Sequence, residues 1–274
     1  MSALKEAIRD WLPPALVRGL RHVRGAGIRY EGDFSTWEEA SASCTGYDAE
    51  PILAKVLSAT LKVKRGEAAF ERDSVLFAEI EYNWSVLAGL MWAAARSGGR
   101  INVLDFGGAL GSSYFQNRKF LQPLPEVCWN VVEQLHYVEA GQTQIQDENL
   151  RFYKSIDECL SENQPNVVLL SSVMQYLGSY VEIIGKLGKV GALCLLIDRT
   201  PFSSSAQNQL VVQKVPAEIY AASYPMWIFS HSKFLQLIKQ DWSLVASSLS
   251  PEGHVRTVEG NDFLFKGMLL EAKP

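Results

Sequence analysis

The sequence has few of the features that mark secreted, membrane-spanning or zinc-binding proteins. Its four cysteines form no C-x-x-C pair and have no histidine at zinc-finger spacing, so we expect neither a disulfide framework nor a zinc site. No apolar run approaches the ~20 residues of a membrane helix, and no long apolar stretch at the N-terminus resembles a signal peptide. These absences predict a protein of the reducing cytoplasm with free thiols.

A basic excess is also lacking, which argues against nucleic acid as a partner. The formal net charge is -4, with hydrophobic residues at 47% and charged residues at 20%. Proteins that bind nucleic acid through its phosphates carry clustered positive charge instead. The N/D-P-P-Y/F signature of enzymes that act on base amino groups is missing as well. The composition is that of a folded globular protein.

From about residue 98 the chain alternates short apolar runs with helical patterns. The runs are "INVLDF", "WNVVEQ", "LRFYKS", "NVVLLSS" and "GALCLLIDR". Continuous apolar runs separated by helices are typical of parallel strands that are buried on both faces. Two late segments, "WSLVASSLS" and "FLFKGMLLEA", have no clear helix between them, which favours an antiparallel pair at the sheet's edge. The pattern predicts an α/β fold with a mostly parallel, doubly wound, Rossmann-like sheet.

We divide the chain at about residue 97. Residues 1–97 are predicted to form a mostly helical flank or lid, with helical patterns from Ala49 to Arg96. Residues 98–274 are predicted to form the Rossmann-like domain, with an insertion at about 199–230. A helix over "SHSKFLQLIKQ" should follow that insertion, because a serine is available as its N-cap.

The segment 1–29 is basic and has apolar residues at helical spacing. Its basic residues outnumber its two acids, Glu6 and Asp10. The basic residues are Lys5, Arg9, Arg18, Arg21, Arg24 and Arg29. A basic amphipathic helix can lie on anionic lipid or dock onto its own protein. The first interpretation predicts peripheral contact with the inner face of the membrane, and both remain open.

The stretch "LDFGGALGSSYF" joins the first apolar run to a helix through a glycine-rich turn. Gly107, Gly108 and Gly111 follow Asp105, and such a turn lets the backbone and the next helix's N–H groups approach a ligand. Dinucleotides prefer G-x-G-x-x-G, which is missing here. Enzymes that bind S-adenosylmethionine tend to show an acid, one residue, then alternate glycines, and here Ala109 replaces one of these. A turn that serves only strand-to-helix packing is the structural alternative.

Polar residues follow the next predicted strands at the same edge of the sheet. Glu133 ends the second run, where a carboxylate can accept hydrogen bonds from both ribose hydroxyls of an adenosine. Its structural alternative is a solvated acid at a strand end. Ser155 is expected near the adenine edge, and Ser171 and Ser172 at the rim where ligands of open α/β sheets bind.

The chain resembles a bacterial family of S-adenosylmethionine-dependent methyltransferases whose members tend to be encoded among genes for surface polysaccharide such as O-antigen. The resemblance rests on "LDFGGALGSSYF", "WNVVEQ", "LLSSVMQYL", "IDRTPF" and "VVQKVPAEIYAASYPMWIFS". It implies a class I methyltransferase fold, S-adenosylmethionine as the cofactor and S-adenosylhomocysteine as the product. It also implies an acceptor hydroxyl on a sugar, a sugar nucleotide or a lipid-linked glycan.

Methyl transfer to a hydroxyl needs a base, or a metal, to remove the proton. The fourth apolar run ends in serines rather than clustered acids, so we expect no metal. His231, which starts the helix after the insertion, is the first candidate base, and Asp198 at the end of the fifth run is the second. A capping or surface role for His231, and an ion pair of Asp198 with Arg199, are the structural alternatives.

The insertion carries a mixture of aromatic and hydrogen-bonding side chains that suits the faces and hydroxyls of a sugar. These candidate acceptor residues are Arg199, Gln213, Tyr220, Tyr224 and Trp227. For each of the three aromatic residues, packing of the insertion onto the sheet is the structural alternative.

Two other functions remain open at this point. One is a non-catalytic binding or scaffold protein in glycan assembly, which Ala109 and the lack of an evident base favour. The other is a nucleotide-sugar oxidoreductase, which the missing G-x-G-x-x-G disfavours. The sequence predicts no oligomeric state.

Overall fold

The protein divides into two compact units, as seen in a computed structural model that describes residues 27–45, 49–72, 74–216 and 222–273. The smaller unit takes its described residues from Met1–Tyr47, Leu210–Met226 and Arg256–Asn261. The larger unit comprises Asp48–Gln209, Trp227–Val255 and Asp262–Pro274. Residues 49–97, which the sequence analysis assigns to the flank, therefore lie in the same unit as the central sheet.

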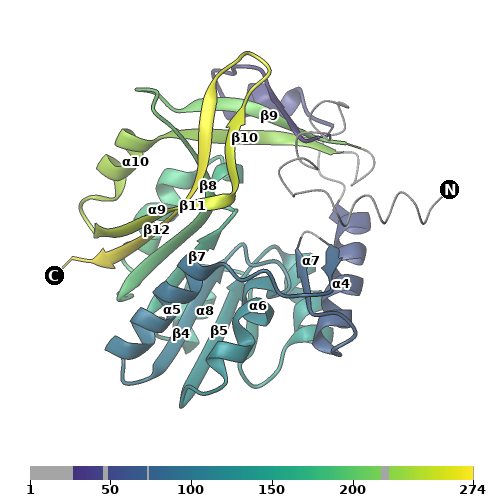
Figure 1. Ribbon diagram of the computed structural model, residues 1–274, viewed down its shortest axis with the longest axis vertical. Coiled ribbons are helices and arrows are strands. Elements are labelled where there is room, and N and C mark those ends of the chain that lie inside the picture. Colours follow the sequence, from purple (N-terminus) through teal and green to yellow (C-terminus); the bar gives the residue numbers. More distant parts are fainter. Residues whose placement is uncertain (1–26, 46–48, 73, 217–221, 274) are drawn as a thin grey trace. The chain divides into compact units, whose positions relative to one another are not determined.

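A mostly parallel sheet forms the centre of the larger unit (Figure 1). Its strands in spatial order are β6 (Leu150–Tyr153), β5 (Glu126–Val132), β4 (Arg100–Phe106), β7 (Val167–Ser171), β8 (Cys194–Ser203), β12 (Asp262–Ala272) and β11 (Trp242–Arg256). Its helices are α4 (Ala49–Lys64), α5 (Trp84–Arg96), α6 (Ser112–Leu121), α7 (Leu135–Ala140), α8 (Ile156–Glu162), α9 (Tyr180–Leu187) and α10 (His231–Ile238), with short helical turns at Gly141–Ile145 and Met174–Tyr176. The predicted α/β, Rossmann-like fold class is confirmed.

The strand order reverses direction between β4 and β7. After β4 the chain adds β5 and β6 on one side, then returns to add β7 and β8 on the other, all in parallel. Strand β12 runs antiparallel to β8, with Leu270 opposite Leu195, so the predicted antiparallel strand near the sheet's C-terminal edge is confirmed. In sheets of this kind ligands bind outside the carboxyl ends of the strands, at the point of reversal. That point lies at Phe106 and Ser171.

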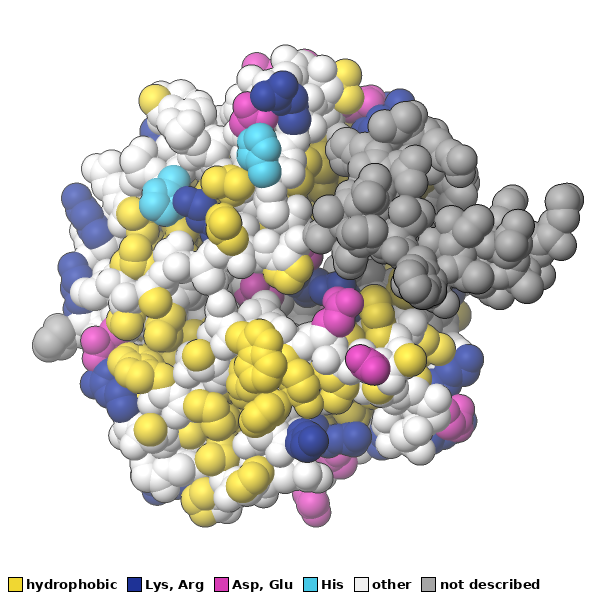
Figure 2. All heavy atoms as spheres, in the orientation of Figure 1, with side chains coloured by type: hydrophobic (Ala, Val, Ile, Leu, Met, Phe, Trp, Pro, Cys, Tyr) yellow, Lys and Arg dark blue, Asp and Glu magenta, His cyan; other side chains and the backbone are white. Residues whose placement is uncertain are grey.

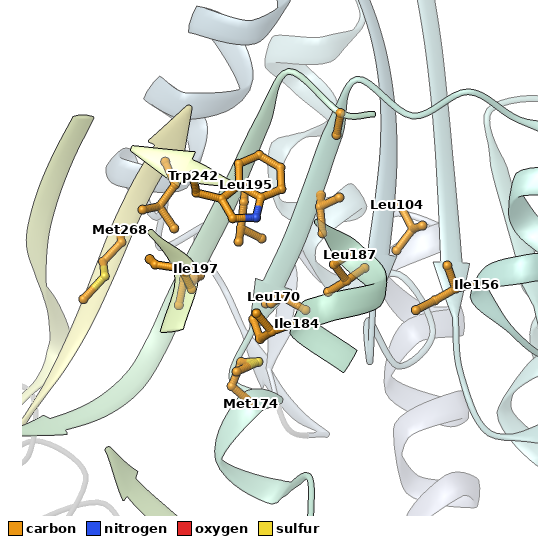
Figure 3. Close-up of a cluster of buried hydrophobic side chains, with 14 of the residues drawn as sticks. Leu104, Ile156, Leu170, Met174, Ile184, Leu187, Leu195, Ile197, Trp242 and Met268 are labelled. Atoms are coloured by element: carbon orange, nitrogen blue, oxygen red, sulfur yellow. The ribbon is translucent and has the colours of Figure 1, made fainter. Parts of the chain in front are cut away.

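The core forms because alternate residues of the buried strands meet helices on both faces. On one face Leu170, Leu195 and Ile197 pack with Ile184 and other side chains of α9 and α10 (Figure 3). The side chain of Leu196, which alternates with these, lies against α5 on the opposite face. Burial of each large aliphatic side chain contributes roughly 1.5–3 kcal/mol to folding. This packing holds the carboxyl ends of the strands in a fixed register.

The segment between α4 and α5 contains a feature that the helical pattern did not predict. A hairpin forms from β2 (Phe70–Arg72) and β3 (Val75–Phe77), with the rings of Phe70 and Phe77 5.7 Å apart. The expectation of helix from Ala49 to Arg96 is therefore wrong over this stretch, because a cross-strand aromatic pair stabilises the hairpin instead. The predicted cap of α10 is present, since the Ser230 hydroxyl accepts from the Lys233 N–H.

The smaller unit combines residues of the N-terminal segment with part of the predicted insertion. Strand β9 (Gln209–Val215) pairs antiparallel with β1 (Arg29–Glu31), and β10 (Ala222–Ser230) lies on its other side and runs on into the larger unit. Helix α3 (Trp37–Ala42) completes its described elements. No helix in the described part of the chain is long and apolar enough to cross a membrane.

Candidate ligand site at the carboxyl ends of the strands

The glycine-rich turn connects β4 to α6 at the point where the strand order reverses. Its backbone is left-handed at alternate residues, with φ of 71° at Gly107, 50° at Ala109 and 88° at Gly111. The sequence pattern lacked a glycine at Ala109, but the backbone there keeps the conformation that glycine favours. The three positions therefore form one tight turn over the end of β4.

We expect Ala109→Gly to increase the free energy of unfolding slightly. A left-handed alanine is strained by roughly 1–2 kcal/mol, and glycine removes that strain at the cost of greater freedom in the unfolded chain. The net gain should be about 0.5 kcal/mol, measured by denaturant unfolding. Ala109→Val should change stability in the opposite direction, and an Ala109→Gly variant less stable than the wild type would contradict this account.

Asp105 places a buried carboxylate directly beneath this turn. Its side chain is fully buried, and Oδ2 accepts a hydrogen bond of 2.9 Å from Nε1 of Trp129. Oδ1 has no hydrogen-bond partner among the described residues. A Cβ atom at Gly108 would lie 2.4 Å from Oδ2, so the turn passes directly over the carboxylate. Burial raises the pKa of Asp105 to about 7.

Asp105 should make the protein less stable as the pH rises. The unfolded carboxyl has a pKa of about 3.9, so between about pH 4 and 7 the folded state binds more protons and stability falls as pH increases. Between pH 5 and pH 8 the free energy of unfolding should fall by about 2 to 3 kcal/mol less in Asp105→Asn than in the wild type, because asparagine does not titrate. Urea unfolding at both pH values measures this. Equal falls in the two proteins would show that Asp105 titrates normally.

Two further carboxylates border the turn. Oε1 of Glu133 accepts from the Ala109 N–H at 3.3 Å, and Oε2 accepts from the Gln134 N–H at 2.7 Å. Burial raises the pKa of Glu133. Glu71 of the β2–β3 hairpin is buried and accepts from the hydroxyl of Ser112, the first residue of α6. The start of a helix commonly binds anions. The start of α6 already has a protein carboxylate beside it.

These carboxylates decide which ligands the turn favours. A pyrophosphate at the turn would meet Asp105, Glu133 and Glu71, and like charges repel strongly where water is excluded. A ligand that presents an ammonium or sulfonium group would be attracted instead. The unpartnered Oδ1 of Asp105 also calls for a donor, because an unsatisfied buried acceptor costs roughly 1–3 kcal/mol. The site suits a cationic ligand better than a dinucleotide.

The candidate serines form hydrogen bonds within the protein. The Ser155 hydroxyl accepts from the Glu158 N–H at 3.0 Å and caps α8. Ser171 donates to Oδ2 of Asp198 at 3.1 Å. Ser172 has a left-handed φ of 56°, and its N–H donates to the Asp198 carbonyl. Ser171 and Ser172 therefore lie at the carboxyl end of β7, joined to Asp198 in the middle of the neighbouring strand β8.

Asp198 forms the ion pair that the sequence analysis gave as an alternative. Its Oδ2 lies 3.4 Å from Nε of Arg199, and both side chains are largely buried. Arg199 has a left-handed φ of 46° and also donates to the Ser171 hydroxyl at 3.4 Å. The buried amide of Gln175 donates to the Arg199 carbonyl and to the Ser172 hydroxyl. Strained backbone at Ser172 and Arg199, beside the strained turn, is typical of functional sites.

His231 begins α10 as predicted, and its ring packs edge-on against Phe202 with centroids 5.7 Å apart. Partial burial and the nearby Lys266 lower the pKa of His231. No described contact links the ring to the glycine turn. Its role as a base therefore stays a prediction.

The candidate acceptor residues of the insertion fall in different places. Nε2 of Gln213 donates to the Tyr224 hydroxyl at 3.1 Å within the smaller unit. Trp227, in the larger unit, packs edge-on against Tyr180 with centroids 5.7 Å apart. Tyr220 lies outside the described residues, as does most of the basic segment 1–29.

Two site residues were missed by the sequence analysis, Glu71 and Gln175. Glu71 lies in no motif and comes from a hairpin far from the turn in sequence, whereas Gln175 lies within "LLSSVMQYL" but was given no role. The only available signal for Gln175 was its position just after the fourth apolar run. Among the described residues no group of three or more histidines, cysteines or acids is arranged to hold a metal ion.

No family model and no curated protein sequence matches the chain. Among solved structures, it is similar to the 1,6-didemethyltoxoflavin-N1-methyltransferase of Burkholderia thailandensis, solved with S-adenosylhomocysteine, at 13% identity over 84% of this chain and 92% of that one, with a TM-score of 0.43. An S-adenosylmethionine-dependent methyltransferase of Clostridium acetobutylicum aligns at 8% identity over 81% and 99% of the chains, with a TM-score of 0.47. The N-terminal domain of EvdMO1, solved with SAH and D-fucose, aligns at 11% identity over 83% and 98%, with a TM-score of 0.43. Identities this low concern the fold alone, which the strand order already defines.

Proposed function

We propose that the larger unit binds S-adenosylmethionine at the glycine turn and transfers its methyl group to an acceptor hydroxyl. The observation that carries this proposal is the buried Asp105 carboxylate, whose Oδ1 has no partner, beneath a turn that is left-handed at Gly107, Ala109 and Gly111. The ammonium group of the cofactor's amino acid end fits this arrangement, and a pyrophosphate does not. The resemblance to the methyltransferase family supports the same cofactor.

The proposed cofactor residues are those at the carboxyl ends of β4 to β7. Gly107, Gly108 and Gly111 would lie against the amino acid end, with Asp105 below them. Glu133 would accept hydrogen bonds from the ribose hydroxyls, since its carboxylate already faces the turn through the Ala109 N–H. Charged hydrogen bonds of this kind contribute roughly 1.5–3 kcal/mol each. The other residues proposed to bind the cofactor are Ser155, Ser171 and Ser172.

The proposed acceptor is a hydroxyl of a sugar, a sugar nucleotide or a lipid-linked glycan used in surface polysaccharide synthesis. This choice rests on the family resemblance. The acceptor residues proposed from the sequence are Arg199, Gln213, Tyr220, Tyr224 and Trp227, and the candidate bases named from the sequence are His231 and Asp198. The ion pair with Arg199 weakens the case for Asp198, because its carboxylate is largely buried and already bound to a protein side chain.

The cofactor would supply an activated methyl group. The protein's own residues would hold the cofactor and the acceptor, orient them and exclude water. Transfer breaks the bond between carbon and sulfur, forms a bond between carbon and the acceptor oxygen, and releases the hydroxyl proton to a base. Because this is an in-line displacement, most of the protein's contribution is positioning.

Two measurements test the proposal. Calorimetry should show that S-adenosylmethionine and S-adenosylhomocysteine bind, and that NAD binds more weakly or not at all. Incubation with methyl-labelled S-adenosylmethionine and glycan precursors extracted from the source cells should then label a glycan. Tighter binding of NAD would overturn the cofactor assignment. Binding without transfer to any precursor would favour the alternative, a non-catalytic binding or scaffold protein in glycan assembly.

A further inference from the structure

Strand β11 presents a row of polar side chains on one face. Ser248, Ser250 and Glu252 alternate along the strand, and alternate residues of a strand point to the same face. Ser250 is buried, and its hydroxyl has no hydrogen-bond partner in the part of the chain that the structure describes. Buried hydroxyls are normally satisfied, so this one has unused capacity to bind a ligand or a water molecule.

A glycine in the adjacent strand lets this row approach Asp198. A Cβ atom at Gly267 of β12 would lie 3.0 Å from the Ser248 hydroxyl and 3.7 Å from Oδ1 of Asp198. The pairing of β12 with β8 is irregular at this point, between Lys266 and Met268. The Ser248 hydroxyl of β11 and the Asp198 carboxylate of β8 therefore both border the space that a side chain at position 267 would fill.

Glu252 stands at the outer end of this row, among charges from other elements. It interacts electrostatically with Arg199 and Asp198 of β8 and with Arg72 of β2. Arg199 is already paired with Asp198, and Arg72 with Glu81 at 3.1 Å. Both cations thus have their own counter-ions. Acidic and basic side chains also lie close together near the middle of the face of the molecule drawn in Figure 2.

The surroundings of Glu252 are suited to proton transfer. The residue is exposed to solvent, yet the protein around it removes enough water to raise the pKa of its carboxyl above the ordinary value. Nearby Arg199 and Arg72 act in the opposite direction, and Asp198 acts in the same direction as burial. A solvent-accessible carboxylate with a raised pKa is a better base at neutral pH than an ordinary surface acid.

We propose that Glu252 is the catalytic base of the methyl transfer and that Ser248 and Ser250 hold the acceptor beside it. This inference rests on the proposed function and assigns its acceptor as a molecule with several hydroxyls, one for the base and others for the serines. The other acids near the reversal point are less suitable. Asp105 and Asp198 are buried, and Glu133 accepts from two backbone N–H groups.

In the proposed step the acceptor oxygen attacks the methyl carbon as the carbon–sulfur bond breaks. The bond between oxygen and methyl carbon forms with the electron pair of the hydroxyl oxygen, and the hydroxyl proton passes to a carboxylate oxygen of Glu252. The carboxylate then returns the proton to solvent, which its exposure permits. No other reactant is required.

The test compares single-turnover rates of variants with methyl-labelled S-adenosylmethionine and the extracted glycan precursors. Glu252→Gln should lower the rate ~10²- to 10⁴-fold, the usual contribution of a positioned base, while cofactor affinity by calorimetry stays within a few-fold of wild type. Glu252→Asp should recover part of the rate. His231→Ala and Asp198→Asn should each retain more activity than Glu252→Gln. Glu182→Gln, which changes an exposed acid on α9, serves as the matched control.

The pH profile provides a second readout. The wild-type rate should rise with pH through the raised pKa of Glu252, and this rise should disappear in Glu252→Gln. A Glu252→Gln variant with a wild-type rate, or a collapse confined to His231→Ala or Asp198→Asn, would overturn the assignment. In either case the wild type still binds the cofactor and labels a glycan. Failure of the proposed function is different, because the wild type itself would then bind no cofactor or label no glycan.

Discussion

Gly107→Ala should weaken cofactor binding at least ~10²-fold, because a small displacement of a positioning element has effects of that size. Gly107 has a φ of 71°, and a Cβ atom there would lie 2.3 Å from Cγ2 of Val173. No real contact is that short, so the turn or the segment carrying Val173 must move. Either movement would change the shape of the site around the turn. Calorimetry with S-adenosylhomocysteine measures the loss.

The chain offers a matched control for the backbone strain in this variant. Gly66 has a φ of 76°, but a Cβ atom there would meet nothing within 4 Å. Gly66→Ala should therefore carry a similar strain of roughly 1–2 kcal/mol, which lowers stability, and leave cofactor affinity unchanged. If Gly107→Ala binds the cofactor as tightly as Gly66→Ala does, the turn has no part in binding, and close packing alone explains its glycines.

Glu133→Ala should weaken cofactor binding ~10²- to 10⁴-fold. The variant loses two charged hydrogen bonds to the ribose, at roughly 1.5–3 kcal/mol each. It also loses the carboxylate that accepts from the Ala109 N–H and so supports the turn. Glu133→Gln keeps the shape of the side chain and should show a smaller loss. Calorimetry with S-adenosylhomocysteine again provides the measurement.

The opposite end of the same strand supplies the control for Glu133. Glu126 begins β5, is exposed, and lies at the amino end of the strand, away from the point of reversal. Glu126→Ala should leave cofactor affinity unchanged and should change stability by less than about 0.5 kcal/mol, as is usual for surface substitutions. If Glu133→Ala binds the cofactor as tightly as the wild type, Glu133 does not bind the ribose. The proposal that the glycine turn binds the cofactor would then still stand.

Local patterns determined the larger part of the fold. Continuous apolar runs predicted β4 to β8, because a strand buried on both faces needs apolar residues at every position. The glycine turn after Asp105 and the serine before His231 were also predictable, since turns and caps depend on a few adjacent residues. The same patterns placed Glu133, Ser171 and Ser172 at one edge of the sheet, because parallel strands end together.

Features that depend on distant contacts were not predictable in this way. The β2–β3 hairpin forms where a helix was expected, and it carries Glu71 to Ser112 at the start of α6. The left-handed conformation of Ala109 goes against the preference of its own residue type and persists because the packed turn requires it.

The surroundings of the acids are likewise a property of the tertiary structure. A carboxylate's role depends on its burial and on the charges that surround it, and spacing in the sequence reports neither. The sequence left open whether Asp198 is a base or pairs with Arg199, and the structure shows the pair, whereas Glu252 belonged to no motif and lies near the same two residues. The sequence alone therefore determined strands β4 to β8, the turn and the edge of the sheet at which the candidate site lies. Only the tertiary structure decided which of the acids there are buried, paired or accessible, because it alone brings residues from separate elements into contact.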